Sequence, residues 1–124
     1  MHIVRSAENT VHELPGIRFT ALVSPKRGAR STSVWRVEIA PGTLPTPHQV
    51  TEEEVFVLLQ GCARTVIGGV PGEAAAGDSI VVPKETDFQV ENAGSEPLVA
   101  FVCFPVGGRA RLADGRELTP PWAE

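Results

Sequence analysis

Few residues of this sequence could do chemistry. The side chains able to exchange a proton near neutral pH or to bind soft metals are three histidines and two cysteines: His2, His12, His48, Cys62 and Cys103. No motif places a serine or cysteine nucleophile beside a base. Gly68-Gly69 and Gly107-Gly108 lack the lysine and the following helix of a phosphate-binding loop. Acid–base chemistry and metal binding are the possibilities that these residue types leave open.

The elements that would position such residues read as strands. From Ser33 to Pro105, short apolar runs alternate with glycine and proline, and helical periodicity never persists for more than about two turns. Ser33 to Ile39 alternates in polarity, which places Trp35, Val37 and Ile39 on one buried face. The other expected strands are 18–23, 54–60, 62–67, 79–82, 88–91 and 98–104, with 62–67 as the hairpin partner of 54–60. This pattern predicts an all-β sandwich or barrel, and about eight strands suit a jelly roll.

The run from Glu54 to Gln60 differs from the others because both of its faces are apolar. A strand of this kind must be covered on both sides. If Glu54, Phe56 and Leu58 point inward, then Val55, Val57 and Leu59 need a cover from outside. We predict that a second copy of the chain supplies it in a homodimer, with the terminal segment that carries Trp122 as the alternative.

Length and composition indicate one ordinary globular domain. The 124 residues suffice for one hydrophobic core, and 42% hydrophobic with 21% charged residues is a typical balance. We expect a single domain, 1–124, with a barrel core at about 33–105, N-terminal edge strands at 1–32 and a tail at 106–124. A net charge of -4 disfavours nucleic-acid binding. No apolar run is long enough for a membrane span or a signal peptide, which predicts a cytoplasmic protein without membrane contact.

The spacing in the middle of the chain resembles the paired motifs of the cupin superfamily. The positions that fall in register with these motifs are Gly42, His48, Glu54, Gly61, Gly77, Pro83 and Asn92. The resemblance spans roughly Trp35 to Pro105. It implies a small single-domain cupin with the all-β cupin double-stranded β-helix, the jelly-roll barrel of that superfamily.

Several departures from the motifs fall on the family's metal ligands. Val50 and Phe88 stand where two of the three histidines belong, and Glu85 stands where a glycine belongs. The resemblance therefore supports only His48 and Glu54 as ligand positions, fewer than the three protein ligands of a catalytic zinc. We predict no cofactor. The alternative is a divalent metal held by His48 and Glu54 with a further ligand from Cys62, Cys103 or a terminal histidine.

Without a metal, the barrel interior becomes an apolar cavity. Its expected lining, Trp35, Val50, Phe56, Leu58 and Phe88, suits a small apolar or aromatic molecule. The resemblance also brings His48 and Glu54 close together. They could form one proton-transfer unit, in which Glu54 orients His48 and His48 exchanges the proton, or they could only satisfy each other's hydrogen bonds.

Three functions follow from this site. The first is a biosynthetic enzyme with His48 as acid and base in non-oxidative chemistry, an isomerase, cyclase or lyase. The second is a non-catalytic module that binds a small molecule. The third is a metal-dependent cupin oxygenase with an incomplete ligand set. The absence of tyrosine counts against a close resemblance to the cupin sugar epimerases.

Overall fold

The computed structural model describes residues 2–124, which form strands and three short 3-10 helices and contain no α-helix. The strands are β1 (Thr10–Leu14), β2 (Ile17–Val23), β3 (Thr32–Ile39), β4 (Gln49–Val50), β5 (Glu54–Gln60), β6 (Cys62–Ile67), β7 (Val70–Ala75), β8 (Ser79–Val82), β9 (Phe88–Asn92), β10 (Leu98–Pro105), β11 (Ala110–Arg111) and β12 (Glu117–Leu118). The 3-10 helices are η1 (Ser6–Glu8), η2 (Pro25–Arg27) and η3 (Pro121–Ala123).

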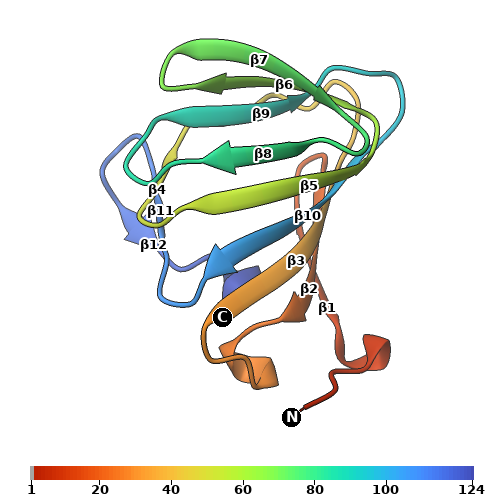
Figure 1. Ribbon diagram of the computed structural model, residues 1–124, viewed down its shortest axis with the longest axis vertical. Coiled ribbons are helices and arrows are strands. Elements are labelled where there is room, and N and C mark those ends of the chain that lie inside the picture. The colour runs from red at the N-terminus through yellow and green to blue at the C-terminus, as the bar shows by residue number, and fades with distance from the viewer. Residues whose placement is uncertain (1) are drawn as a thin grey trace.

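The strands form three sheets, all of them antiparallel (Figure 1). A six-stranded sheet has the order β1-β2-β3-β10-β5-β8, and a three-stranded sheet has the order β7-β6-β9. A small sheet, β12-β11-β4, lies at one side of the barrel (Figure 1). The all-β jelly roll predicted from the sequence is confirmed.

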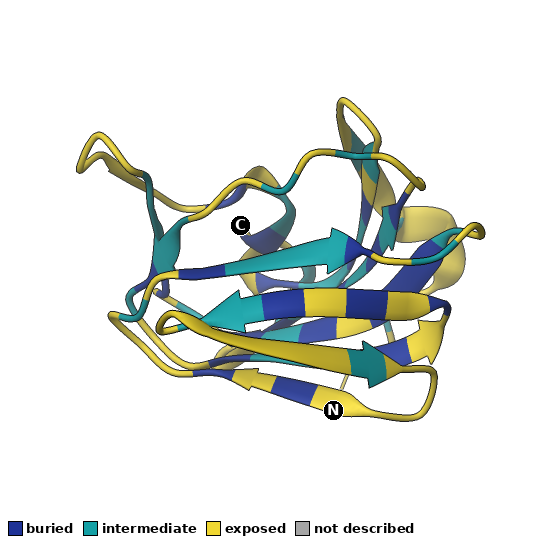
Figure 2. Ribbon diagram, turned by 90° about the horizontal axis from the view of Figure 1, so that it is seen from above, coloured by how far each residue is buried: buried dark blue, intermediate teal, exposed yellow. Residues whose placement is uncertain are grey.

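The core is formed by every second side chain of the long strands, which points into the barrel. On β3, Trp35, Val37 and Ile39 are buried, as their spacing predicted, and β10 adds Val102 and Phe104. Figure 2 shows the resulting bands of buried and exposed residues along the strands. Each large side chain buried in this way contributes about 1.5–3 kcal/mol to folding.

The prediction that 62–67 is the hairpin partner of 54–60 is wrong. A strand has only two edges, and those of β5 are bonded to β10 and β8. The chain leaves β5 at Gly61, which adopts a left-handed conformation with φ 86°, and β6 pairs with β7 and β9 in the other sheet. A tight turn at Gly68-Gly69 joins β6 to β7, which begins at Val70.

The ends of the chain extend the barrel. β1 and β2 continue the six-stranded sheet beyond β3, so that of these two strands β1 lies at an edge of the sheet and β2 lies inside it. In the tail, Trp122 stacks on Phe19 with ring centroids 3.6 Å apart and an interplanar angle of 4°. Trp122 therefore packs against the interior, and the alternative that it covers the outer face of β5 is wrong.

The outer face of the six-stranded sheet keeps apolar side chains in contact with solvent. Leu59 is 45% exposed, Val81 54% and Phe101 38%. Val57 lies opposite Phe101 and Val55 lies opposite Val81 in the pairing of β10, β5 and β8, so these side chains form one continuous patch.

Both cysteines are free thiols; Cys62 is exposed and Cys103 is half-buried. Within residues 2–124 no helix has the length and hydropathy needed to cross a membrane. The cytoplasmic location stays a prediction.

The residues that match the cupin motifs have structural roles that explain their spacing. Gly42, Gly61 and Gly77 all have positive φ angles, which glycine adopts without steric cost. The Asn92 side chain donates hydrogen bonds to the carbonyl oxygens of Ile39, at 2.9 Å, and Glu96, at 2.8 Å. It thereby ties the end of β9 to the end of β3.

We expect Gly61→Ala to cost more stability than Gly42→Ala. A Cβ at Gly61 would lie 2.9 Å from the carbonyl oxygen of Pro97 and 3.1 Å from Cα of Leu98, whereas one at Gly42 would meet nothing within 4 Å. Both variants carry the left-handed strain of about 1 kcal/mol, and Gly61→Ala adds a backbone clash for a total of about 2 kcal/mol or more. Urea unfolding of both variants measures the difference. Equal losses of stability in the two variants would show that the nearby backbone of Pro97 and Leu98 does not penalise a Cβ at Gly61.

Candidate active site

A cavity of about 480 Å³ lies inside the barrel. Its walls are almost entirely apolar and come from the six-stranded sheet, from β9, from residues 43–50 and from the C-terminal tail. Among the described residues that line it, the ionisable side chains are His48 and Glu54, and the other polar ones are Thr43 and Thr46. An apolar cavity with few convergent polar groups is the usual form of a small-molecule site.

His48 is held from two sides. Its backbone N–H donates to the carbonyl oxygen of Phe88 at 3.1 Å, and the N–H of Phe88 donates to the carbonyl oxygen of His48 at 2.9 Å. The two rings also pack together, with centroids 4.5 Å apart. Nδ1 of His48 lies 2.9 Å from the carbonyl oxygen of Thr46, and because a carbonyl only accepts, Nδ1 carries a proton. Nε2 has no hydrogen-bond partner among residues 2–124 and is available to a ligand.

Glu54 begins β5 and points inward, as the alternation of that strand requires. It is 6% exposed, and its carboxyl group makes no hydrogen bond or ion pair within the described part of the chain. Burial among apolar side chains raises the pKa of Glu54 from 4.5 to about 8. At neutral pH this side chain is therefore mainly a carboxylic acid, able to donate a proton.

His48 and Glu54 line the same cavity, but they are not bonded to each other. The Thr46 carbonyl, and not Glu54 as the sequence suggested, orients the imidazole. The two groups therefore do not satisfy each other's hydrogen bonds, and each can meet a ligand separately.

The donor set does not fit the metal that the cupin motifs imply. Val50 and Phe88 offer no donor atom, and no group of three His, Cys, Asp or Glu side chains within residues 2–124 could hold an ion. The substitute ligands considered, Cys62, Cys103, His2 and His12, do not line the cavity. One imidazole nitrogen and one carboxyl group fall short of the three protein ligands of a catalytic zinc site.

The structure brings most of the predicted lining together. Trp35, Val50, Phe56 and Phe88 line the cavity, whereas Leu58, two residues beyond Phe56, is buried in the core and does not reach it. Sequence reasoning missed the wall that the ends of the chain build: Ile17, Phe19, Leu112, Leu118 and Trp122. The alternation from Arg18 to Val23 could have placed Phe19 inward. The short runs in the tail give no such signal.

Comparisons with known proteins place this site in a family context. Residues 35–104 match the Cupin_2 family, described as a cupin domain. Auxin-binding protein 1 of Arabidopsis thaliana is similar at 31% identity over 98 residues, 71% of this chain and 50% of that protein. The chain spans about half the length of the curated relatives that it matches.

Two solved structures illustrate the likeness in fold. An oxalate decarboxylase of Lactobacillus farciminis, solved as a formate complex, matches with a TM-score of 0.73 and 25% identity over 81% of this chain and 32% of that one. The polyketide cyclase RemF of Streptomyces resistomycificus matches with a TM-score of 0.68 and 20% identity over 85% of this chain and 79% of that one.

The burial of Glu54 predicts a pH dependence of stability. Because its pKa is raised to about 8 on folding, the native state holds a proton that the unfolded chain releases above pH 4.5. Its contribution to stability is complete below pH 4.5, decreases as the pH rises from there, and is lost above pH 8. We expect the free energy of unfolding of the native sequence, relative to Glu54→Gln, to fall by about 5 kcal/mol between pH 4.5 and 8.

Chemical denaturation at several pH values measures this difference. Glu53→Gln, the substitution of an exposed neighbour, is the control and should leave the pH profile unchanged. If the native sequence and Glu54→Gln respond to pH in parallel, Glu54 is ionised in the folded state at neutral pH.

Proposed function

The chain belongs to the cupin domain family, and on this basis we propose that it is an enzyme of non-oxidative acid–base chemistry acting on a small apolar or aromatic molecule. The observation that carries the proposal is the placement of one imidazole and one buried carboxyl group, unbonded to each other, in an otherwise apolar cavity. Isomerases, cyclases and lyases can use this combination, because their reactions take a proton from one atom and deliver a proton to another.

The two groups have complementary roles in this proposal. Nε2 of His48 removes a proton from carbon next to a carbonyl group, while the protonated Glu54 donates its proton to the carbonyl oxygen, which gives a neutral enol. The imidazolium then returns its proton at a different carbon while the Glu54 carboxylate takes back the enol proton, which gives an isomer. Alternatively, the enol carbon attacks a second carbonyl, whose oxygen takes the proton from His48 while the enol proton returns to Glu54, which gives a ring. The hydrogen bond from Nδ1 to Thr46 and the packing on Phe88 keep Nε2 aimed at the ligand.

The lining supports an uncharged substrate. No lysine or arginine is among the described residues that line the cavity. An unpaired carboxylate buried there would cost several kcal/mol. The aromatic rings of Trp35, Phe56 and Phe88 offer faces on which a planar molecule could stack.

A non-catalytic binding module is the second candidate. The same apolar lining favours it, since a cavity of this kind binds an apolar molecule whether or not a reaction follows. The metal-dependent oxygenase is not proposed, because the donor set does not support it.

Substitution of the two polar groups separates the candidates. A ligand that co-purifies with the protein would be identified by mass spectrometry and offered as substrate. We expect His48→Gln and Glu54→Gln to lower kcat by about 10² to 10⁴ with little change in affinity. His12→Gln is the control, because His12 lies outside the cavity. Tight binding with no turnover by the native protein would favour the binding module, and turnover unchanged by His48→Gln would exclude the acid–base role.

We propose that the exposed patch of Leu59, Val81 and Phe101 is covered by a second copy of the chain in a homodimer. We expect native protein to have about twice the 13.2 kDa mass of the chain in light scattering, and Phe101→Lys to be monomeric. The control is Val70→Lys, at a residue that is 67% exposed on β7, outside the patch. A monomeric native protein at about 100 μM, far above the Kd of a standard dimer interface, would contradict the proposal.

A further inference from the structure

One wall of the cavity is built by the small sheet β12-β11-β4. Ala110, Leu112 and Leu118 line the cavity from this side, together with Val50 on β4. β11 pairs with β4 and with β12 through only two residue pairs each. A sheet of such short strands has few backbone hydrogen bonds to hold it, so side chains must contribute to keeping the wall in place.

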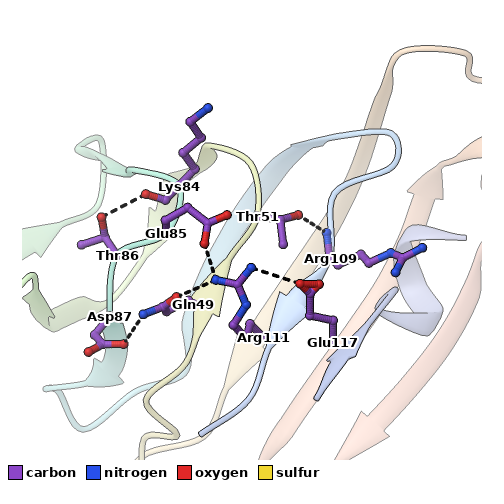
Figure 3. Close-up of polar contacts among 9 residues, drawn as sticks. All are labelled: Gln49, Thr51, Lys84, Glu85, Thr86, Asp87, Arg109, Arg111 and Glu117. Atoms are coloured by element: carbon purple, nitrogen blue, oxygen red, sulfur yellow. Dashed lines mark hydrogen bonds and ion pairs between the residues drawn. The ribbon is translucent and has the colours of Figure 1, made fainter. Parts of the chain in front are cut away.

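The other face of this small sheet carries Arg111, whose guanidinium bonds to three side chains (Figure 3). It donates to Gln49 at 3.1 Å and to Glu117 at 3.0 Å, and it forms an ion pair with Glu85. Gln49 donates in turn to Asp87 at 2.8 Å. The planar fork of arginine suits such a junction, because its donors point in several fixed directions.

The partners of Arg111 connect it to the candidate active site. Gln49 directly follows His48, and Asp87 directly precedes Phe88, whose ring packs on the imidazole. Glu85 lies in the loop that leads to Phe88, and its N–H donates to the carbonyl oxygen of Val50 at 2.8 Å. One side chain therefore links the tail wall, the His48 segment and the Phe88 loop.

The backbone of Glu85 is a second observation at this junction. Among residues 2–124, Glu85 is the only non-glycine residue with a positive φ, which is 60°. It stands at the position where the cupin motif has glycine. Glycine would adopt this conformation without strain. A residue with a side chain is strained in this backbone conformation, but its side chain can make a contact that glycine could not make, and here that contact is the ion pair with Arg111.

We infer that Arg111 is a positioning residue of the cavity: it fastens the C-terminal wall to the His48 and Phe88 segments and so retains the bound ligand. This inference rests on the proposed function, because both require that the cavity binds the ligand. Because the junction is charged and one third of the Arg111 side chain is exposed, at 32%, salt should weaken it.

The test compares four variants with a neutral fluorescent probe, N-phenyl-1-naphthylamine. Arg111→Met removes the charge, Arg111→Lys keeps it but loses the fork, and Glu85→Gly removes the carboxylate while accepting the backbone conformation. Arg64→Met is the matched control, since it breaks another Arg–Glu pair between strands, Arg64 with Glu91 at 2.8 Å, away from the cavity.

We expect Arg111→Met to speed probe dissociation about tenfold, as loss of charged hydrogen bonds would, and Arg64→Met to change it less than about twofold. Arg111→Lys should release the probe at a rate between those of the native protein and Arg111→Met. In 1 M NaCl, the rate of probe dissociation from the native protein should rise toward that of Arg111→Met. Glu85→Gly should also release the probe faster without a lower melting temperature. Amide exchange should rise over residues 110–118, and the imidazole NMR signals of His48, but not those of His12, should shift.

Two outcomes would overturn the inference: amide exchange at 110–118 and His48 signals unchanged in Arg111→Met, or equal effects of Arg111→Met and Arg64→Met. If Arg111→Met fails to fold, the same measurements on Glu85→Gly, and on native protein with and without 1 M NaCl, test the inference instead. If native protein does not bind the probe, the ligand site in the proposed function is contradicted, while amide exchange and the His48 signals still decide the role of Arg111.

Discussion

Strand β5 is hydrogen-bonded along both of its edges, and the rest of the structure depends on this constraint. With β10 on one side and β8 on the other, β5 cannot shift its register without breaking two ladders. The period of two then commits Glu54 and Phe56 to the interior and Val55 and Val57 to the outer face. The same strand thus produces a buried carboxyl group on one side and an apolar patch facing solvent on the other.

The cavity needs more of the chain than the part that matches the family. Residues 35–104 provide the imidazole, the carboxyl group and three of the aromatic rings. The remaining wall comes from the first strands and from the tail, where Phe19 and Trp122 stack. These segments lie outside the matched region, but β2 also pairs with β3 and buries Phe19 and Ala21. They therefore complete both the barrel and the wall of the cavity.

The sequence predicted the parts of the fold that depend on local pattern. The burial of Trp35, Val37 and Ile39 followed from alternation in a long strand, and the inward position of Glu54 followed from the same rule. The pairing of 62–67 could not be predicted in this way, because it depends on which edges of β5 other strands already occupy. The two-residue strands β4, β11 and β12 are too short to have a period, so the wall that they form and its link through Arg111 appeared only in three dimensions.

The substitutions that remove metal ligands also change what the remaining groups can do. Val50 and Phe88 leave the backbone frame intact, as the paired hydrogen bonds between His48 and Phe88 show. Even Glu85 keeps a left-handed conformation, with φ 60°, in place of the motif glycine. With no cationic side chain lining the cavity in residues 2–124, burial favours the protonated form of Glu54, and the Thr46 carbonyl fixes the proton of His48 on Nδ1. One group can then give a proton where the other can take one. This complementarity arises because the two groups are held by different neighbours and not by each other.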